Sequence, residues 1–231
     1  MPDLLGVVRT AATLTNRVLV SYSGGKDSVV TLDLCSKHFE QVAAFFMYQV
    51  PGLSFQERTL RWAEAKYGIE ILRVPHFEVA DFLRFGTYHD EDATVRPVAV
   101  NELYAYVREQ SGTYWIAAGE RIADSILRRA MIKHDGTIDD KRGRIYPLAH
   151  WTKAHVKAYV ARYGLRTAEE AQYLGHSFRD LSAKTLVLVK QHYPEDYERI
   201  LRMYPLAEAA VKQREFYGGE HNGEPADQLG I

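Results

Sequence analysis

The sequence contains one cysteine, Cys35, among 231 residues. A single thiol excludes an internal disulfide, a cysteine-based zinc or iron–sulfur centre and a relay between two thiols of this chain. Cys35 falls on the apolar side of a predicted helix, so we expect it to be a buried core residue rather than a nucleophile.

Long apolar runs and an excess of charge of either sign are also missing. No run approaches the roughly 20 apolar residues that span a bilayer. The amino-terminal sequence MPDLLGVVRTAATL lacks the pattern of a secretory signal. We therefore expect a cytoplasmic protein that does not associate with a membrane. The formal net charge is −1, which gives no global attraction to nucleic acid. Only a local basic patch is predicted, from Arg121, Arg128, Arg129 and Lys133.

The most informative segment runs from Arg17 to Cys35 and reads RVLVSYSGGKDSVVTLDLC. Its first part, Val18 to Tyr22, has the β-branched and aromatic residues of a buried strand. From Ser28 to His38 apolar residues recur at helical spacing, which predicts a helix. Residues 23–28, Ser-Gly-Gly-Lys-Asp-Ser, therefore form the turn between the two, and we call them the glycine turn.

The glycine turn has the chemistry of an anion site. Its two glycines have no Cβ, so they can take positive φ and bring bare amides close to a ligand. We expect Asp27 or Ser28 to cap the helix, and the helix dipole and the Lys26 ammonium to favour a phosphate chain. The turn is not a Walker A loop, because that pattern needs glycine in place of Val20 and Ser or Thr in place of Asp27.

The remaining pattern predicts an α/β fold. Residues 41–50 and 69–74 read as buried strands, and residues 54–67 as the helix between them. This repetition predicts right-handed crossovers and a largely parallel sheet of about five strands with helices on both faces. Ligands then bind at the carboxyl ends of the strands, where the glycine turn falls. Further helices are expected at 98–109, 122–133, 153–163, 178–188 and 195–216, and further strands at 114–118 and 144–146.

The chain is expected to form one nucleotide-binding domain over residues 1–216, with a helical carboxyl-terminal part at about 165–216. The tail, residues 217–231, is rich in glycine and polar residues, which predicts disorder. The helix and strand patterns weaken over residues 77–96, and FGTYHDEDATVRP at residues 85–97 has a polar, turn-like composition, which suggests a mobile flap over the site. A run of polar residues within it is interpreted as a solvated loop rather than a metal site: His89, Asp90, Glu91 and Asp92.

Another glycine at a strand end, Gly119, follows the predicted strand 114–118. It opens a polar stretch that includes Arg121, Ser125 and Arg128, and we call residues 119–128 the arginine segment. On a helix, Arg121 and Ser125 would share one face, with Arg128 one turn further. Arginine presents a fixed fork of donors to phosphate or sulfate. The segment predicts either further anion contacts beside the glycine turn or a solvated basic helix face.

Three motifs together resemble the phosphoadenosine phosphosulfate reductase family of the N-type ATP pyrophosphatase (PP-loop) superfamily, over approximately residues 15–165. They are the glycine turn, the arginine segment and YPLAHWTK at residues 146–153. The resemblance implies an adenine nucleotide α-hydrolase-like fold, with phosphate or sulfate of the nucleotide held by the glycine turn. The residues that it implies for nucleotide binding are Ser21, Ser23, Gly24, Gly25, Lys26, Asp27, Ser28, Gly119, Arg121 and Arg128.

The chain departs from the family pattern in two places. Family reductases attack sulfur with a cysteine near the carboxyl terminus, and residues 199–231 contain none. Without that thiolate, no covalent thiosulfonate forms on this segment. Relatives often carry Asp-Thr-Gly after the second strand, whereas this chain has Gln-Val-Pro-Gly at residues 49–52, so the nucleoside contact of that acidic residue is not carried over.

The leading hypothesis is a PP-loop enzyme that binds ATP with Mg²⁺, adenylylates an acceptor and releases pyrophosphate, for subsequent amidation or thiolation. Lys26 and Arg121 would stabilise charge on the phosphates, and Asp27, the third candidate catalytic residue, would either hold Mg²⁺ or cap the helix. The acceptor is a small molecule or a nucleic acid base, and a homodimer is left open. The alternatives are a sulfonucleotide reductase that uses an external thiol and a non-catalytic nucleotide sensor or adaptor.

Overall fold

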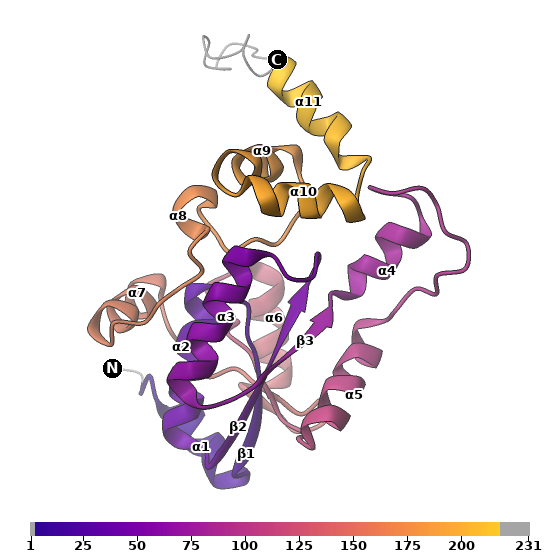
Figure 1. Cartoon of the computed structure of the whole chain (residues 1–231). Helices are drawn as coiled ribbons and strands as arrows, with labels where there is room; N and C mark the ends of the chain where they lie inside the picture. Colours follow the sequence, from indigo (N-terminus) through magenta and orange to yellow (C-terminus); the bar gives the residue numbers. More distant parts are fainter. Residues whose placement is uncertain (1–2, 218–231) are drawn as a thin grey trace, which may run out of the picture.

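The computed structural model describes residues 3–217. Within this range one sheet has six strands in the order β3-β2-β1-β4-β6-β5 (Figure 1). Neighbouring strands are parallel except β5 and β6, which are antiparallel. The strands are β1 (Arg17–Ser21), β2 (Gln41–Tyr48), β3 (Ile71–Pro75), β4 (Ile116–Ala117), β5 (Ile138–Asp139) and β6 (Arg144–Ile145).

The helices lie between and after the strands, and the predicted α/β class with a mostly parallel sheet is confirmed. Up to β6 they are α1 (Gly6–Leu14), α2 (Lys26–His38), α3 (Ser54–Tyr67), α4 (Phe77–Arg84), α5 (Val100–Ser111) and α6 (Ile126–Asp135). After β6 they are α7 (Lys153–Arg162), α8 (Ala171–Leu174), α9 (Ala183–His192), α10 (Pro194–Met203) and α11 (Ala207–Tyr217).

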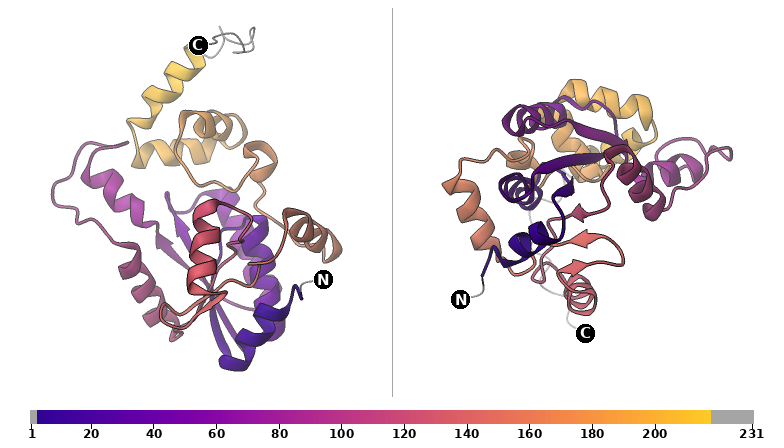
Figure 2. Two further views of the ribbon diagram at one scale, coloured as in Figure 1. Left: turned by 180° about the vertical axis from the view of Figure 1, so that it is seen from behind. Right: turned by 90° about the horizontal axis from the view of Figure 1, so that it is seen from below.

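Helices cover both faces of the sheet because side chains alternate along each strand. In β1, Val18 and Val20 pack in one apolar cluster with residues of α2 and α3. Leu19, which points the other way, packs with Leu103 and Val107 of α5. The views in Figure 2, from behind and from below, show the strands between these two groups of helices. The predicted two-sided cover is therefore confirmed.

The carboxyl-terminal helices pack beyond the ends of the strands. Val50 and Leu53, which follow β2, share an apolar cluster with residues of α9, α10 and α11, and Figure 1 shows α9 and α10 past the tips of β2 and β3. The Asp196 carboxylate of α10 accepts hydrogen bonds from the amide and hydroxyl of Ser54, at 2.8 and 2.7 Å. This contact fixes the amino end of α3 to the carboxyl-terminal region.

The structure corrects several expected boundaries. Helix α1 and strand β5 were not expected, and the helix expected at 122–133 begins at Ile126, because the Ser125 hydroxyl caps it by accepting from the Arg128 amide at 3.1 Å. The helix expected at 195–216 is two helices. Pro205 lacks an amide hydrogen and keeps the residue before it out of the helical region, which ends α10.

The segment 77–96, where the sequence pattern is weak, is partly helical. Helix α4 occupies its first eight residues, and Val79 on α4 is buried. Tyr88, in the irregular part, packs against the ring of Tyr204 at a centroid distance of 6.0 Å. Among residues 3–217, no cluster of three or more His, Cys, Asp or Glu side chains has the arrangement of a metal site.

Two further expectations concern the membrane and the tail. Within residues 3–217, none of the helices combines the length and apolar character needed to cross a bilayer. Tyr217, the first residue of the predicted tail, ends helix α11, and residues 218–231 lie outside the described residues. The assignment of residues 1–216 to one domain stays a prediction.

Candidate functional site

The glycine turn connects the end of β1 to the start of α2. Gly24 has φ of +71°, a conformation that side chains with a Cβ rarely adopt. A Cβ on Gly24 would lie 3.2 Å from Thr59 Cγ2, so space also favours glycine. The Gly24 carbonyl accepts a hydrogen bond from the Ala168 amide at 2.8 Å, which attaches the turn to a segment far along the chain.

Ser28 folds the glycine turn back on the first turn of α2. Its hydroxyl donates to the Gly25 carbonyl at 2.9 Å and accepts from the Ser23 amide at 3.1 Å. The expectation that Asp27 or Ser28 caps α2 is wrong. The helix begins at Lys26, its N-cap residue is Gly25, and no side chain caps it. The first amides of α2 are therefore available to an anion, and the helix dipole adds to the attraction.

Lys26 and Arg121 both reach Asp27. The Lys26 ammonium contacts Asp27 Oδ2, and Arg121 Nε lies 3.3 Å from Asp27 Oδ1. Both Asp27 Oδ1 and Arg121 Nε are buried, and neither has a well-directed hydrogen-bond partner among the described residues. Arg121 Nε can therefore donate to an anion, and Asp27 Oδ1 can bind a cation, without loss of a directed hydrogen bond between these two atoms, while Arg121 Nη2 stays bound to Asp124.

These residues fit an ATP phosphate chain with Mg²⁺. In nucleotide sites, Mg²⁺ is usually bound by one or two carboxylates together with phosphate oxygens. Asp27 offers one carboxylate at the amino end of α2, and its Oδ1 lacks a directed donor. Lys26 and Arg121 offer cationic donors to phosphate oxygens.

Gly119 brings the end of β4 against the start of α2. A Cβ on Gly119 would lie 3.0 Å from the Asp27 carbonyl carbon and 3.2 Å from its Cβ. Strands β1 and β4 are neighbours, with Val20 in register with Ala117. The glycine turn and the arginine segment thus meet at Asp27 because Gly119 has no side chain.

The arginine segment is not helical at Arg121, so the predicted shared helix face of Arg121 and Ser125 is wrong. Arg121 lies in a turn, where its amide and its guanidinium both donate to Asp124. Its side chain is only 7% exposed. The Arg128 side chain is 51% exposed and lies 3.8 Å from Asp124. The structure thus places Arg121 inside the site and Arg128 at its margin.

Two other sequence predictions are located by the structure. Ser21 is the last residue of β1, in register with Phe45 of β2, two positions before the glycine turn. Cys35 lies on α2 with an exposed fraction of 0%, and burial raises the pKa of its thiol. The prediction that Cys35 is a core residue is confirmed.

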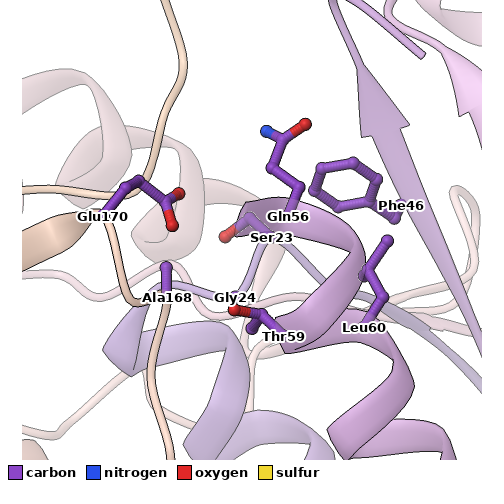
Figure 3. A pocket seen from close by; sticks show the side chains of 8 residues that line it. All are labelled: Ser23, Gly24, Phe46, Gln56, Thr59, Leu60, Ala168 and Glu170. Carbon is purple, nitrogen blue, oxygen red and sulfur yellow. The ribbon is translucent and has the colours of Figure 1, made fainter. Parts of the chain in front are cut away.

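Sequence reasoning missed the residues that cover the glycine turn. The Ala168 amide donates to the Gly24 carbonyl. Ser177 also lies close to the turn, because its Oγ would be 3.3 Å from a Cβ placed on Gly25. Beside the turn is a small cavity of ≈ 10 Å³ (Figure 3). No local pattern pairs residues this far apart in the sequence. The cavity is lined by Ser23, Gly24, Phe46, Gln56, Thr59, Leu60, Ala168 and Glu170.

A family model, the phosphoadenosine phosphosulfate reductase domain, matches residues 17–169. The chain belongs to this family. The match includes the glycine turn, the arginine segment and Ala168, and it ends before helices α8 to α11. No curated protein matches the chain.

One solved structure shares the fold at low sequence identity, and two others are similar to the chain. The phosphoadenylyl-sulfate (PAPS) reductase of Candida auris, a phosphate complex, is 19% identical with a TM-score of 0.54, over 77% of this chain and 87% of that one. The U34-tRNA thiolase NcsA of Methanococcus maripaludis is 20% identical with a TM-score of 0.49, over 83% and 72%. The NH3-dependent NAD synthetase of Campylobacter jejuni is 12% identical with a TM-score of 0.48, over 98% and 96%. The family match and the Candida auris structure confirm the adenine nucleotide α-hydrolase-like fold implied by the sequence, and the roles of the site residues stay predictions.

Proposed function

We propose that the chain is a PP-loop enzyme that binds ATP with Mg²⁺, transfers the adenylyl group to an acceptor and releases pyrophosphate. The observation that carries this proposal is the uncapped amino end of α2, where Lys26 and Arg121 both reach Asp27. Free helix amides and two cations of different geometry suit a polyphosphate rather than a single weakly charged group.

In the proposed reaction, an oxygen of the acceptor attacks the α phosphorus of ATP. The bond between the α phosphorus and the bridging oxygen breaks, and its electrons leave with pyrophosphate. Lys26 and Arg121 stabilise the negative charge that gathers on the phosphates, which is the main way that a protein accelerates such transfers. Mg²⁺, when bound, neutralises further phosphate charge, with Asp27 as its protein ligand. A second nucleophile then displaces AMP from the acceptor.

Membership of the reductase family favours a second candidate, a sulfonucleotide reductase that uses an external thiol. The chain's own thiol is unsuited to attack on sulfur, because Cys35, on α2, is buried in an apolar cluster. This candidate predicts tight binding of an adenylyl sulfate with a 3′-phosphate, and sulfite release on addition of a small thiol.

The deciding experiment incubates the full chain with Mg²⁺ and ATP labelled at the α phosphate, with cell extract as a source of acceptors. Labelled AMP together with pyrophosphate is the expected result. Sulfite release from an adenylyl sulfate, without AMP formation from ATP, would favour the reductase. ATP binding without turnover in any extract would identify a nucleotide sensor or adaptor.

A further inference from the structure

Helix α6 leaves two large apolar side chains uncovered. Ile126 and Leu127, in its first turn, have exposed fractions of 83% and 82%, and Ile132 is the buried residue of this helix. In the view from behind in Figure 2, α6 lies in front of the sheet and no other described helix covers its outer side. Adjacent aliphatic side chains left in water in this way mark an interaction surface more often than single ones do.

The same stretch of α6 is basic. Residues 126–134 include two arginines and a lysine, and they contain no Asp or Glu. All three of these cationic side chains are exposed, so they can meet a partner without unfolding the helix. We call the exposed apolar pair and the three cations together the α6 surface, which consists of Ile126, Leu127, Arg128, Arg129 and Lys133.

The carboxylates that flank this stretch are already paired with other cations. Asp124 binds Arg121, and its side chain is 17% exposed. Asp135 binds Arg142, and its side chain is 13% exposed. Because both acids are mostly withdrawn from solvent, the positive charge of the α6 surface faces outward, and its partner carries negative charge.

The α6 surface adjoins the candidate site. Asp124 binds the Arg121 guanidinium, the Ser125 hydroxyl caps α6, and Ile126 begins the helix. Side chains of an α-helix lean toward its amino end, so Ile126 and Leu127 lean toward the arginine segment. A partner bound here therefore lies beside the place where the arginine segment meets the glycine turn.

We infer that the α6 surface docks a strand of nucleic acid. Phosphates repeat along such a strand, and Arg129 and Lys133 lie one helical turn apart, about 6 Å along the axis, so one strand reaches both. Leucine and isoleucine are among the side chains that insert between stacked bases. An acidic protein also attracts the cations, but the position favours nucleic acid: a base drawn into the adjoining site leaves its stack, and the aliphatic pair is placed to fill the gap.

The docking surface goes beyond the proposed function and does not depend on ATP chemistry. That the docked strand also supplies the acceptor rests on the proposed function. In that step a carbonyl oxygen of the base bonds to the α phosphorus, and the bond from phosphorus to the bridging oxygen breaks. Its electrons leave with pyrophosphate, and the base loses its ring N–H proton to solvent.

The first binding test measures charge and needs no ATP. Fluorescence anisotropy gives the affinity of the full chain for labelled RNA and DNA of one sequence, single-stranded and duplex, between about 50 and 200 mM salt. Arg129→Gln and Lys133→Gln should each reduce the slope of log affinity against log salt by about 0.7–0.9. Lys157→Gln, which alters an exposed lysine on α7, should keep the slope. Tighter binding of RNA or of DNA identifies the strand, and equal slopes in all four proteins would overturn the inference.

The second binding test examines the apolar pair. Ile126→Ser combined with Leu127→Ser should keep the fold, because both side chains are exposed, and should weaken nucleic acid binding at least roughly tenfold with an unchanged salt slope. A 2-aminopurine base in the duplex should become brighter with the wild type, as it leaves the stack, and not with the double variant. Unchanged affinity in that variant would overturn the inference. So would equal competition by polyglutamate, which would assign the α6 surface to an acidic protein.

The activity test treats the cell extract with nuclease before it is added to α-labelled ATP. Nuclease should abolish AMP formation, and the oligonucleotide that binds should restore it in the wild type but not in the double variant. AMP formation that survives nuclease would refute the supply of the acceptor by the strand while the proposed function stands. Salt-dependent binding through the α6 surface without AMP formation would support the docking surface and count against the proposed function.

Discussion

The glycine turn and the arginine segment both meet at Asp27, but different forces hold them. The turn is held by backbone and hydroxyl hydrogen bonds, from Ala168 to Gly24 and around Ser28. The arginine segment is held by charge, because Asp124 binds both the amide and the guanidinium of Arg121. A ligand therefore finds the turn ready, whereas it must compete with carboxylates for the arginine.

This difference separates two contributions to binding. Backbone amides fixed by the fold need no reorganisation when an anion arrives, which is the advantage of a preorganised site. A buried arginine paired with carboxylates has already lost its water, and removing either partner leaves an uncompensated charge. We therefore expect changes at the turn to affect catalysis and local conformation, and changes at Arg121 to affect the distribution of charge.

The largest effect is expected from the charge of the turn. Lys26→Ala should lower AMP formation roughly a hundredfold, because one preorganised cation is lost where phosphate charge develops. Steady-state assay with α-labelled ATP measures it. Lys184→Ala, which removes an exposed lysine from α9, should have no effect. Normal turnover in Lys26→Ala would contradict the proposed role of the turn.

The arginine segment is best tested at constant charge. Arg121→Lys keeps the cation but loses the planar fork, so ATP affinity should fall roughly tenfold or more, as for a lost charge-assisted hydrogen bond. Arg128→Lys should change affinity by less than about twofold, because that side chain is half exposed. Calorimetric titration of the two variants measures the difference. Equal losses would show that Arg128 belongs to the site as much as Arg121.

The conformation of the turn gives a smaller, structural effect. Gly24→Ala should lower the free energy of unfolding by about 1–2 kcal/mol, because alanine is strained at positive φ. Gly68→Ala is the matched control, since Gly68 has φ of +64° with nothing within 4 Å of its Cβ position. Urea unfolding should show a larger loss for Gly24→Ala, through crowding against Thr59, and a loss of ATP affinity in that variant alone.

The same contrast explains what the sequence could predict. The glycine turn was found because strand, turn and helix are contiguous and each obeys a local rule. The arginine segment could be predicted from its composition, but the prediction of a helix at Arg121 was wrong. Asp124 accepts from the Arg121 amide and closes a turn there instead. Asp124 stands three residues after Arg121, so the acidic side chain was a usable signal.

The cover of the site could not be predicted, because it depends on contacts across the fold. Ala168 and Glu170 reach the glycine turn only after the chain has crossed the sheet and passed α7. Nothing in their local sequence pairs them with residues some 140 positions earlier. Likewise, the unpaired state of Gln56 and Glu170 follows from burial, which one sequence does not disclose.

The smallest expected effect is a pH dependence of stability caused by Glu170, one of the residues that cover the glycine turn. Burial raises the pKa of Glu170 above its ordinary 4.5, against the opposing Phe178 amide, with Glu169 adding to the rise and His176 reducing it. The folded chain then binds this proton more tightly than the unfolded chain, so stability should fall as pH rises from 4.5 through the folded pKa of Glu170. Urea unfolding in sodium buffers should show this fall in the wild type and a shallower one in Glu170→Gln. If stability depended on pH equally in the wild type and in Glu170→Gln, then Glu170 ionises without loss of stability. Its carboxylate would then need no further hydrogen-bond donor.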